Sequence, residues 1–209
     1  MEKIYETAYA KINLGLDVLG KRSDGYHEVR MVMQSVGLSD AVEIEEGEGL
    51  VVETDHSGLA GGPDNLAWKA AELLARCCGK IPNVHIRLNK KIFLAAGLAG
   101  GSSDAAAVMR GLSRLWQLDL TAPELEKLAA ELGSDIPFCI TGGTALAEGR
   151  GEILTELPEA PELLLVLAKP KLEVATGWVY GNFRQQKVNQ RPDIDGIICL
   201  LYTSPSPRD

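Results

Sequence analysis

The first part of the chain alternates apolar residues with polar or small ones. This period of two is typical of strands with one buried face. It is clearest over residues 8–16 and continues over residues 29–36 and 41–45. A turn signal, Ser-Asp-Gly, interrupts it at residues 23–25. The pattern predicts a group of strands within residues 4–54.

Helical spacing of apolar residues begins further along the chain. Residues 66–78 carry it, with Asn65 as a candidate N-cap and Gly79 as a stop signal. Residues 103–116 and 122–132 show similar spacing. The sequence therefore predicts three helices after the strand-rich start.

The remaining segments give shorter signals. Residues 84–88 and the surroundings of Leu146 and Ile153 favour short extended segments. The apolar run at residues 163–167 predicts a short buried strand, and a helix is expected to start within residues 174–183. No internal repeat is visible. Because strands come first and helices follow without regular alternation, we expect an α+β fold and not a doubly wound sheet.

Composition limits the class of protein. The chain has 209 residues with 45% hydrophobic content, which suits one domain and part of a second. A net charge of −8 argues against a general nucleic-acid binder. The four cysteines have neither zinc spacing nor a disulfide framework, which favours a reducing compartment. Without a signal stretch or a run long enough to span a bilayer, we expect a cytoplasmic protein with no membrane partner.

Glycines cluster just before the helix expected from residue 103. Gly97, Gly100 and Gly101 are followed by Ser102 and Ser103. Such a loop lets a ligand approach the backbone, and a helix start offers free N–H groups, so phosphate is a suitable ligand. No lysine follows in the P-loop pattern, and the spacing differs from the dinucleotide fingerprint. A tight turn with close helix packing remains the alternative.

Two segments of the strand-rich part carry candidate chemistry. Lys11 and Asn13 are two residues apart on a predicted strand, so their side chains should share a face. Tyr26 and His27 follow the turn and could hold a planar base by stacking and hydrogen bonding. The alternatives are a solvated strand face and an ordinary surface histidine.

Two aspartates flank the predicted helices. Asp135 lies between a helix end and Pro137, which should stop the helix from continuing, and is either a catalytic group or a cap. Asp104, expected in a first helical turn, is interpreted as a partner of the helix dipole.

Together and in this order, these segments resemble the GHMP small-molecule kinases. Within that superfamily they are similar to the kinases that act on a cytidine diphosphate-linked methylerythritol. The motifs lie at residues 10–14, 21–28, 95–106 and 133–138. The glycine loop alone points to the superfamily, whereas the first two motifs point to the narrower family. Phe93 departs from the pattern, because the family's loop often begins with proline.

The resemblance implies a domain organisation. We expect a GHMP kinase N-terminal, ATP-binding domain, similar to domain 2 of ribosomal protein S5, over residues 1–155. The start of a ferredoxin-like C-terminal domain should follow over residues 156–198. The family chain continues further, so we expect the product of an intact gene to be active and this chain to have little activity.

Residues 199–209 do not fit the rest of the chain, because they have neither periodicity nor a cap. A nucleotide string that resembles a transposase-type sequencing adapter can encode them. We therefore expect a non-native tail there.

The resemblance also implies the reaction, which is transfer of a phosphoryl group from ATP, with Mg²⁺, to the 2-hydroxyl of the methylerythritol moiety. Asp135 would be the base and Lys11 its cationic partner. The substrate would be bound by Asn13, Tyr26, His27 and Tyr180. The ATP phosphates would be wrapped by the glycine loop, which comprises Phe93, Leu94, Ala95, Ala96, Gly97, Leu98, Ala99, Gly100, Gly101, Ser102 and Ser103.

Three other functions remain open on the sequence. One is another GHMP kinase, acting on homoserine, mevalonate or a sugar. The second is a non-enzymatic binding module on the same fold, which the negative charge disfavours. The third is a fragment with no function of its own.

Overall fold

A single mixed sheet forms the centre of the protein. The computed structural model describes residues 3–172, 174, 176–184 and 187–203. The strands are β1 (Lys3–Lys21), β2 (His27–Glu46), β3 (Leu50–Thr54), β4 (Val84–Asn89), β5 (Thr144–Glu148) and β6 (Ile153–Glu156). The α+β class predicted from the sequence is confirmed.

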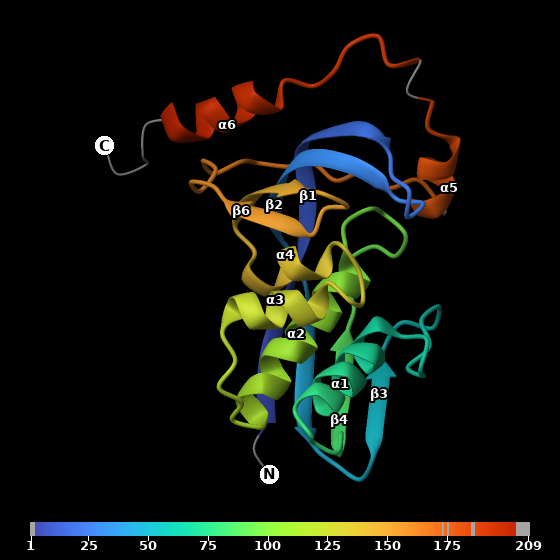
Figure 1. The fold of residues 1–209 in the computed structure, drawn as a ribbon. Helices are drawn as coiled ribbons and strands as arrows, with labels where there is room; N and C mark the ends of the chain where they lie inside the picture. Colours follow the sequence, from blue (N-terminus) through green and yellow to red (C-terminus); the bar gives the residue numbers. More distant parts are fainter. Residues whose placement is uncertain (1–2, 173, 175, 185–186, 204–209) are drawn as a thin grey trace.

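The long strand β2 organises this sheet. It pairs with β1 along one edge, and with both β4 and β5 along the other, so the order is β3-β4-β2-β5-β6 with β1 beside β2. All neighbours are antiparallel except β3 and β4. In Figure 1, β1 and β2 run the length of the sheet and curve over its upper end. Their pairing register shifts at three places, one of them between Tyr9 and Lys11.

Helices cover one face of the sheet. They are α1 (Leu66–Cys77), α2 (Gly100–Leu115), α3 (Ala122–Ala129), α4 (Ile136–Thr141), α5 (Thr176–Asn182) and α6 (Ile194–Thr203). Helices α1, α2 and α4 contact the strands and α3 packs on these three helices, whereas α5 and α6 lie near the curved end of the sheet (Figure 1). None of the helices in the described part of the chain is long and apolar enough to cross a membrane.

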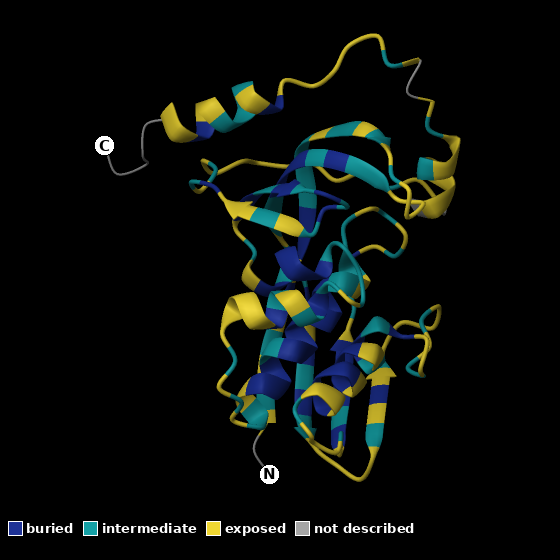
Figure 2. Cartoon of the chain, in the orientation of Figure 1, coloured by how far each residue is buried: buried dark blue, intermediate teal, exposed yellow. Residues whose placement is uncertain are grey.

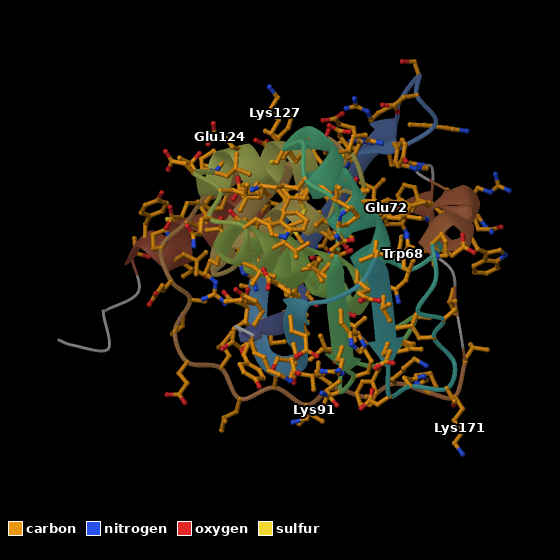
Figure 3. The ribbon with its side chains drawn as sticks, turned by 90° about the horizontal axis from the view of Figure 1, so that it is seen from below. Trp68, Glu72, Lys91, Glu124, Lys127 and Lys171 are labelled. Atoms are coloured by element: carbon orange, nitrogen blue, oxygen red, sulfur yellow. The ribbon has the colours of Figure 1, made fainter. Side chains whose placement is uncertain are left out.

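The core lies between the sheet and these helices, as the buried stretches of Figure 2 show. Its largest fully buried members include Ile44, Leu74, Ile86, Leu88, Met109 and Leu112. The helix α3 presents Leu125 and Ala129 to this core. Its charged residues Glu124 and Lys127 point outward in Figure 3. Burial of apolar faces from both layers therefore holds the helices on the sheet.

Of the three predicted helices, α1 matches closely, α2 begins early, and α3 ends at Ala129 instead of residue 132. Asn65 caps α1 as predicted, because its Oδ1 accepts from the N–H of Ala67 at 2.9 Å. The helix α2 begins at Gly100, three residues before the expected start. Asp104 therefore lies beyond the first turn and is buried, so its interpretation as a helix-dipole partner is wrong.

The C-terminal part corrects one prediction and modifies another. Residues 163–167 form no strand, and Leu164 and Val166 are 99% and 95% exposed. No described strand pairs with this run, and a strand needs a neighbour for its backbone groups. Helix α6 extends into the segment expected to be a non-native tail and buries Leu201 there. The nature of that tail and the domain boundary near residue 155 stay predictions.

Candidate active site

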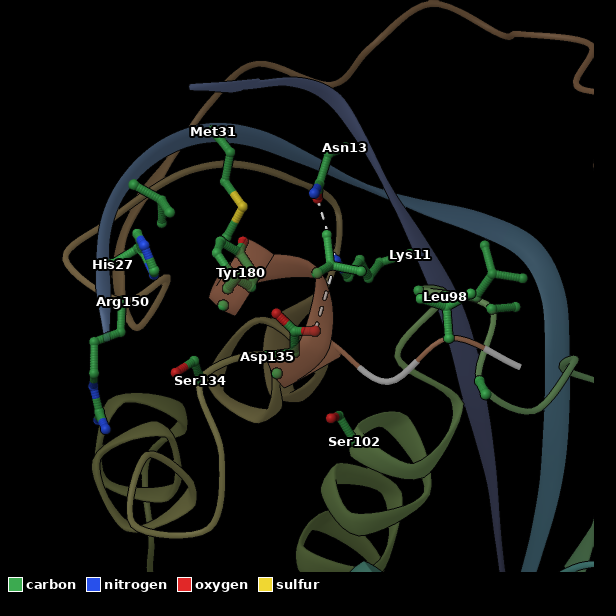
Figure 4. Close-up of a pocket in the computed structure, with 18 of the residues that line it drawn as sticks. Lys11, Asn13, His27, Met31, Leu98, Ser102, Ser134, Asp135, Arg150 and Tyr180 are labelled. Carbon is green, nitrogen blue, oxygen red and sulfur yellow. Dashed lines mark hydrogen bonds and ion pairs between the residues drawn. The ribbon is translucent and has the colours of Figure 1, made fainter. Parts of the chain in front are cut away.

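A cleft of about 1060 Å³ opens where the curved ends of β1 and β2 meet the glycine loop and the start of α4. Figure 4 shows many of its side chains. It brings together most of the residues that the sequence singled out. These are Lys11, Asn13, Tyr26, His27, Phe93, Ala95, Ala96, Gly97, Leu98, Ser102, Asp135 and Tyr180.

Lys11 and Asp135 form an ion pair within the cleft. Lys11 Nζ lies 3.6 Å from Asp135 Oδ2 and donates to Asn13 Oδ1 at 3.3 Å, as Figure 4 shows. The shared face predicted for Lys11 and Asn13 is confirmed. The Lys11 side chain is only 7% exposed, whereas that of Asp135 is 34% exposed. The carboxylate is thus open to a ligand and the ammonium stands behind it.

The local backbone explains these positions. The register shift before Lys11 changes the course of β1 next to the cleft, as bulges beside active sites do. The N–H of Lys11 also donates to Leu98 O at 3.1 Å, which ties β1 to the middle of the glycine loop. The pair is therefore held on a strand and not on a free loop.

Asp135 is the residue immediately before α4. Its side chain makes no capping hydrogen bond, which disfavours the interpretation as a cap. Pro137 does not end a helix as expected, because α3 has already ended at Ala129. Proline stands instead in the first turn of α4, where no N–H partner is needed. This leaves the Asp135 carboxylate free to face the cleft.

The glycine loop reaches α2 through left-handed backbone. Gly97, Ala95 and Ala99 have φ of 71°, 50° and 57°. Helix α2 has no side-chain cap and no acidic residue in its first turn. Its first intrahelical N–H donor is Ser103, which donates to Ala99 O at 2.8 Å. The N–H groups before it are unpaired by the helix and can bind an anion.

Gly100 and Ser103 pack at the end of the loop and do not face the cleft. A Cβ on Gly100 would lie 3.0 Å from Ile92 Cγ2, so glycine permits close approach there. Ser103, expected in the loop that wraps the phosphates, is 1% exposed and its hydroxyl donates to Gly100 O instead of facing the cleft. Leu94, Ala99, Gly100, Gly101 and Ser103 lie outside the residues that line the cleft.

Three aromatic side chains, His27, Tyr180 and Phe183, lie together in what we call the aromatic end of the cleft. The rings of His27 and Tyr180 are 5.3 Å apart and inclined by 32°, and Phe183 meets His27 edge-on at 6.2 Å. Burial, and then the nearby Asp135 charge, raise the pKa of the Tyr180 hydroxyl. This aromatic end lies on β2 and α5, which are far apart in the sequence.

Three basic residues that line the cleft were missed by the sequence analysis. Arg150 lies over the ring of Tyr26 with its guanidinium carbon 4.9 Å from the ring centre. Lys21 and Lys169 also line the cleft. Lys21 is the last residue of β1, whereas the other two lie in loops without a distinctive pattern, so only the fold brings the three together. They supply positive charge in a chain whose net charge is −8.

Comparison with known proteins gives the class. The model of the GHMP kinases N terminal domain matches residues 65–143. A solved homoserine kinase from Cytophaga hutchinsonii is 17% identical with a TM-score of 0.59, covering 92% of this chain and 63% of its own. That likeness shows the shared fold.

Closer relatives give the family. A 4-diphosphocytidyl-2-C-methyl-D-erythritol kinase from Acetivibrio thermocellus is 48% identical over 97% of this chain and 72% of its own length. One from a Synechococcus strain is 51% identical over 93% and 63%. A crystal structure of 4-(cytidine 5'-diphospho)-2C-methyl-D-erythritol kinase is 33% identical with a TM-score of 0.75, covering 95% and 71%. The chain belongs to the 4-diphosphocytidyl-2-C-methyl-D-erythritol kinases. It spans about 63–72% of the length of these relatives.

Proposed function

We propose that this protein transfers a phosphoryl group from ATP to the 2-hydroxyl of 4-diphosphocytidyl-2-C-methyl-D-erythritol, in the cytoplasm. One observation carries the proposal. The Lys11–Asp135 pair and Ser102 of the uncapped first turn of α2 line the same cleft. Phosphoryl transfer needs a group that accepts the hydroxyl proton and a cradle for the phosphates, more than covalent chemistry.

Asp135 is the proposed general base. Its carboxylate is open to the cleft and accepts the proton of the attacking hydroxyl, and the Lys11 ammonium 3.6 Å behind it stabilises the negative charge that develops. Such a base typically contributes about 10²–10⁴-fold to the rate. The remaining acceleration comes from alignment of the two substrates.

The glycine loop, residues 93–103, is the proposed phosphate cradle. The unpaired N–H groups at the start of α2 and the Ser102 hydroxyl supply donors, while buried Ser103 supports the loop from behind. The family implies Mg²⁺, which usually binds through phosphates, waters and few protein oxygens. The described residues contain no cluster of three or more metal-ligating His, Cys, Asp or Glu side chains. Mg²⁺ bound with ATP would supply positive charge that neutralises the phosphates.

The aromatic end is the proposed cytidine site. His27 and Tyr180 offer ring faces and hydrogen-bonding groups, and Tyr26 is half-exposed at the rim. Base–aromatic stacking is typically worth about 1–3 kcal/mol. Asn13, beside Lys11, holds a polar group of the same substrate.

A substrate panel tests this proposal. The product of the complete open reading frame and the 209-residue chain are each assayed for ADP release. The acceptors are the cytidine diphosphate-linked methylerythritol, homoserine, mevalonate and galactose. We expect turnover with the first acceptor by the longer protein, and much less by this chain. Preference for another acceptor would favour a different GHMP kinase, and RNA binding without turnover would favour a binding module.

Asp135→Asn gives the sharper test, with the exposed Asp64→Asn as its matched control. Asp135→Asn should lower kcat by at least about 10²-fold while ATP still binds, because only the proton acceptor is lost. Asp64→Asn should behave as the unmodified protein. Full turnover by Asp135→Asn would remove this residue from the mechanism.

A further inference from the structure

A buried cluster of charges lies beneath the glycine loop. Asp40 of β2, Lys90 directly after β4 and Asp104 of α2 all have side chains that are at most 1% exposed. Lys90 Nζ donates to Asp40 Oδ2 at 2.5 Å and also to Asp104 Oδ2. None of the three side chains lines the cleft.

The cluster joins both ends of the loop to the sheet. Lys90 stands just before the loop and Asp104 just after it, so one ammonium bridges its entry and its exit. Asp40 Oδ1 also accepts from the backbone N–H groups of Lys91 and Ile92, the latter at 2.8 Å. The entry is thus fixed to β2 by its backbone, whereas the exit is joined to β2 by a side-chain bridge through Lys90.

The loop between these ends has few other anchors. Ala95 and Ala99 hold left-handed backbone that L-residues disfavour by roughly 1–2 kcal/mol each. Only surrounding contacts can maintain such a conformation. One of these is the bond from the Lys11 N–H to Leu98 O in the middle of the loop. The packing of Gly100 on Ile92, with Lys90 Nζ close by, fixes its exit.

Buried ion pairs are a poor means of stabilising a fold, because desolvation offsets much of the attraction. Their best-attested use is to fix one geometry among alternatives. An apolar side chain in place of Lys90 could fill the space, but it could not fix the carboxylates of β2 and α2 to one point. The cluster is therefore suited to setting the position of the loop.

We propose that Lys90 is a positioning residue, which clamps the two ends of the nucleotide loop to β2 through Asp40 and Asp104 and thereby holds the α2 N-terminus ready for the phosphates. This inference rests on the proposed function for the identity of the ligand. The clamp itself is a property of the free protein.

One oxygen of the cluster remains open. Asp104 Oδ1 is buried and, among the described residues, has no hydrogen-bond partner. Burial raises the pKa of Asp104 to about 7, and the Asp40 carboxylate opposes ionisation further, while Lys90 acts in the opposite direction. Two carboxylates around one ammonium thus favour an added proton, which would not disturb the bond between Lys90 and Asp104 Oδ2.

Hydrogen exchange of the free protein tests the clamp without any ligand. The variant is Lys90→Met, and the matched control is Lys91→Met, whose side chain points outward in Figure 3. Lys90→Met should increase exchange of the amides at residues 93–103 by about tenfold or more, while α1 and β4 keep their protection. Equal loss of protection across the whole sheet would show that Lys90 stabilises the fold as a whole and does not position the loop, which would overturn the proposal.

Ligand binding gives the second measurement. Lys90→Met should weaken binding of a non-hydrolysable ATP analogue by about tenfold, roughly one lost charged hydrogen bond, and leave binding of the cytidine substrate within about twofold. Equal weakening of both ligands, or of neither, would contradict the clamp. Failure of the unmodified protein to bind the cytidine substrate would instead overturn the proposed function.

If Lys90→Met does not fold, a pair of variants at Asp104 replaces it. Asp104→Asn keeps an oxygen that can accept from Lys90, whereas Asp104→Ala removes it. The clamp predicts faster loop exchange and weaker nucleotide binding for Asp104→Ala, with Asp104→Asn close to the unmodified protein. Identical behaviour of the two variants would overturn the proposal.

Discussion

Asp104→Asn should change how the stability of the protein depends on pH. Asp104 is 1% exposed, and its pKa is raised from 3.8 to about 7, mainly because burial disfavours the charged carboxylate. A raised carboxyl pKa stabilises the fold fully below the unfolded pKa, and this contribution is lost as the pH rises to the folded pKa. Asparagine does not titrate, so Asp104→Asn should remove this contribution to the pH dependence of stability.

The magnitude follows from the two pKa values. Each unit of difference corresponds to about 1.4 kcal/mol, so the contribution lost between about pH 4 and pH 7 is on the order of 4 kcal/mol. Between about pH 5 and pH 8 the free energy of unfolding of Asp104→Asn, relative to the unmodified protein, should therefore rise by roughly 2–3 kcal/mol.

Urea unfolding at the two pH values measures this difference, with Asp64→Asn as the control for loss of an exposed carboxylate. Equal slopes of unfolding free energy against urea concentration would show that all the proteins expose the same surface area on unfolding. If the free energy of unfolding changes by the same amount between about pH 5 and pH 8 in Asp104→Asn and in the unmodified protein, the account of a proton held in the buried cluster is wrong.

Further predictions concern the aromatic end, the core and the loop. His27→Ala should raise KM for the cytidine substrate by roughly tenfold with little change in kcat, because it removes the ring that packs 5.3 Å from Tyr180; an unchanged KM in steady-state kinetics would refute its role. Leu74→Ala should lower the free energy of unfolding by about 2–5 kcal/mol, whereas Leu164→Ala, at a 99% exposed position, should change it by less than about 0.5 kcal/mol; thermal and urea denaturation would check both. Ala99→Gly should raise the melting temperature slightly, since its φ of 57° suits glycine at a gain of up to about 1 kcal/mol, and a lower melting temperature would contradict the strain.

The local elements could be predicted because their signals are local. Asn65 before an apolar helical repeat caps α1 through a bond two residues away. The shared face of Lys11 and Asn13 follows from the strand period alone. The run at residues 163–167 had an equally clear apolar signal, but a strand needs a partner, and the sequence does not show which strands will be available.

The site was partly predictable for the same reason. The glycine loop could be predicted from its local motif, and Asp135 from its position near Pro137. The resemblance to a known family then related the two to one reaction. The cluster of Asp40, Lys90 and Asp104 could not be predicted, because its members lie on three elements and meet only in the folded protein. Nothing in the local pattern distinguishes buried Lys90 from its exposed neighbour Lys91.

The most direct test of the central claim is the fate of the phosphoryl group. The product of the complete open reading frame is incubated with ATP, Mg²⁺ and 4-diphosphocytidyl-2-C-methyl-D-erythritol, and the mixture is followed by phosphorus NMR. The account predicts a new phosphate monoester on the 2-hydroxyl, formed together with ADP, and its loss in Asp135→Asn. Absence of that monoester with intact ATP binding, or its formation at an undiminished rate in Asp135→Asn, would contradict the account.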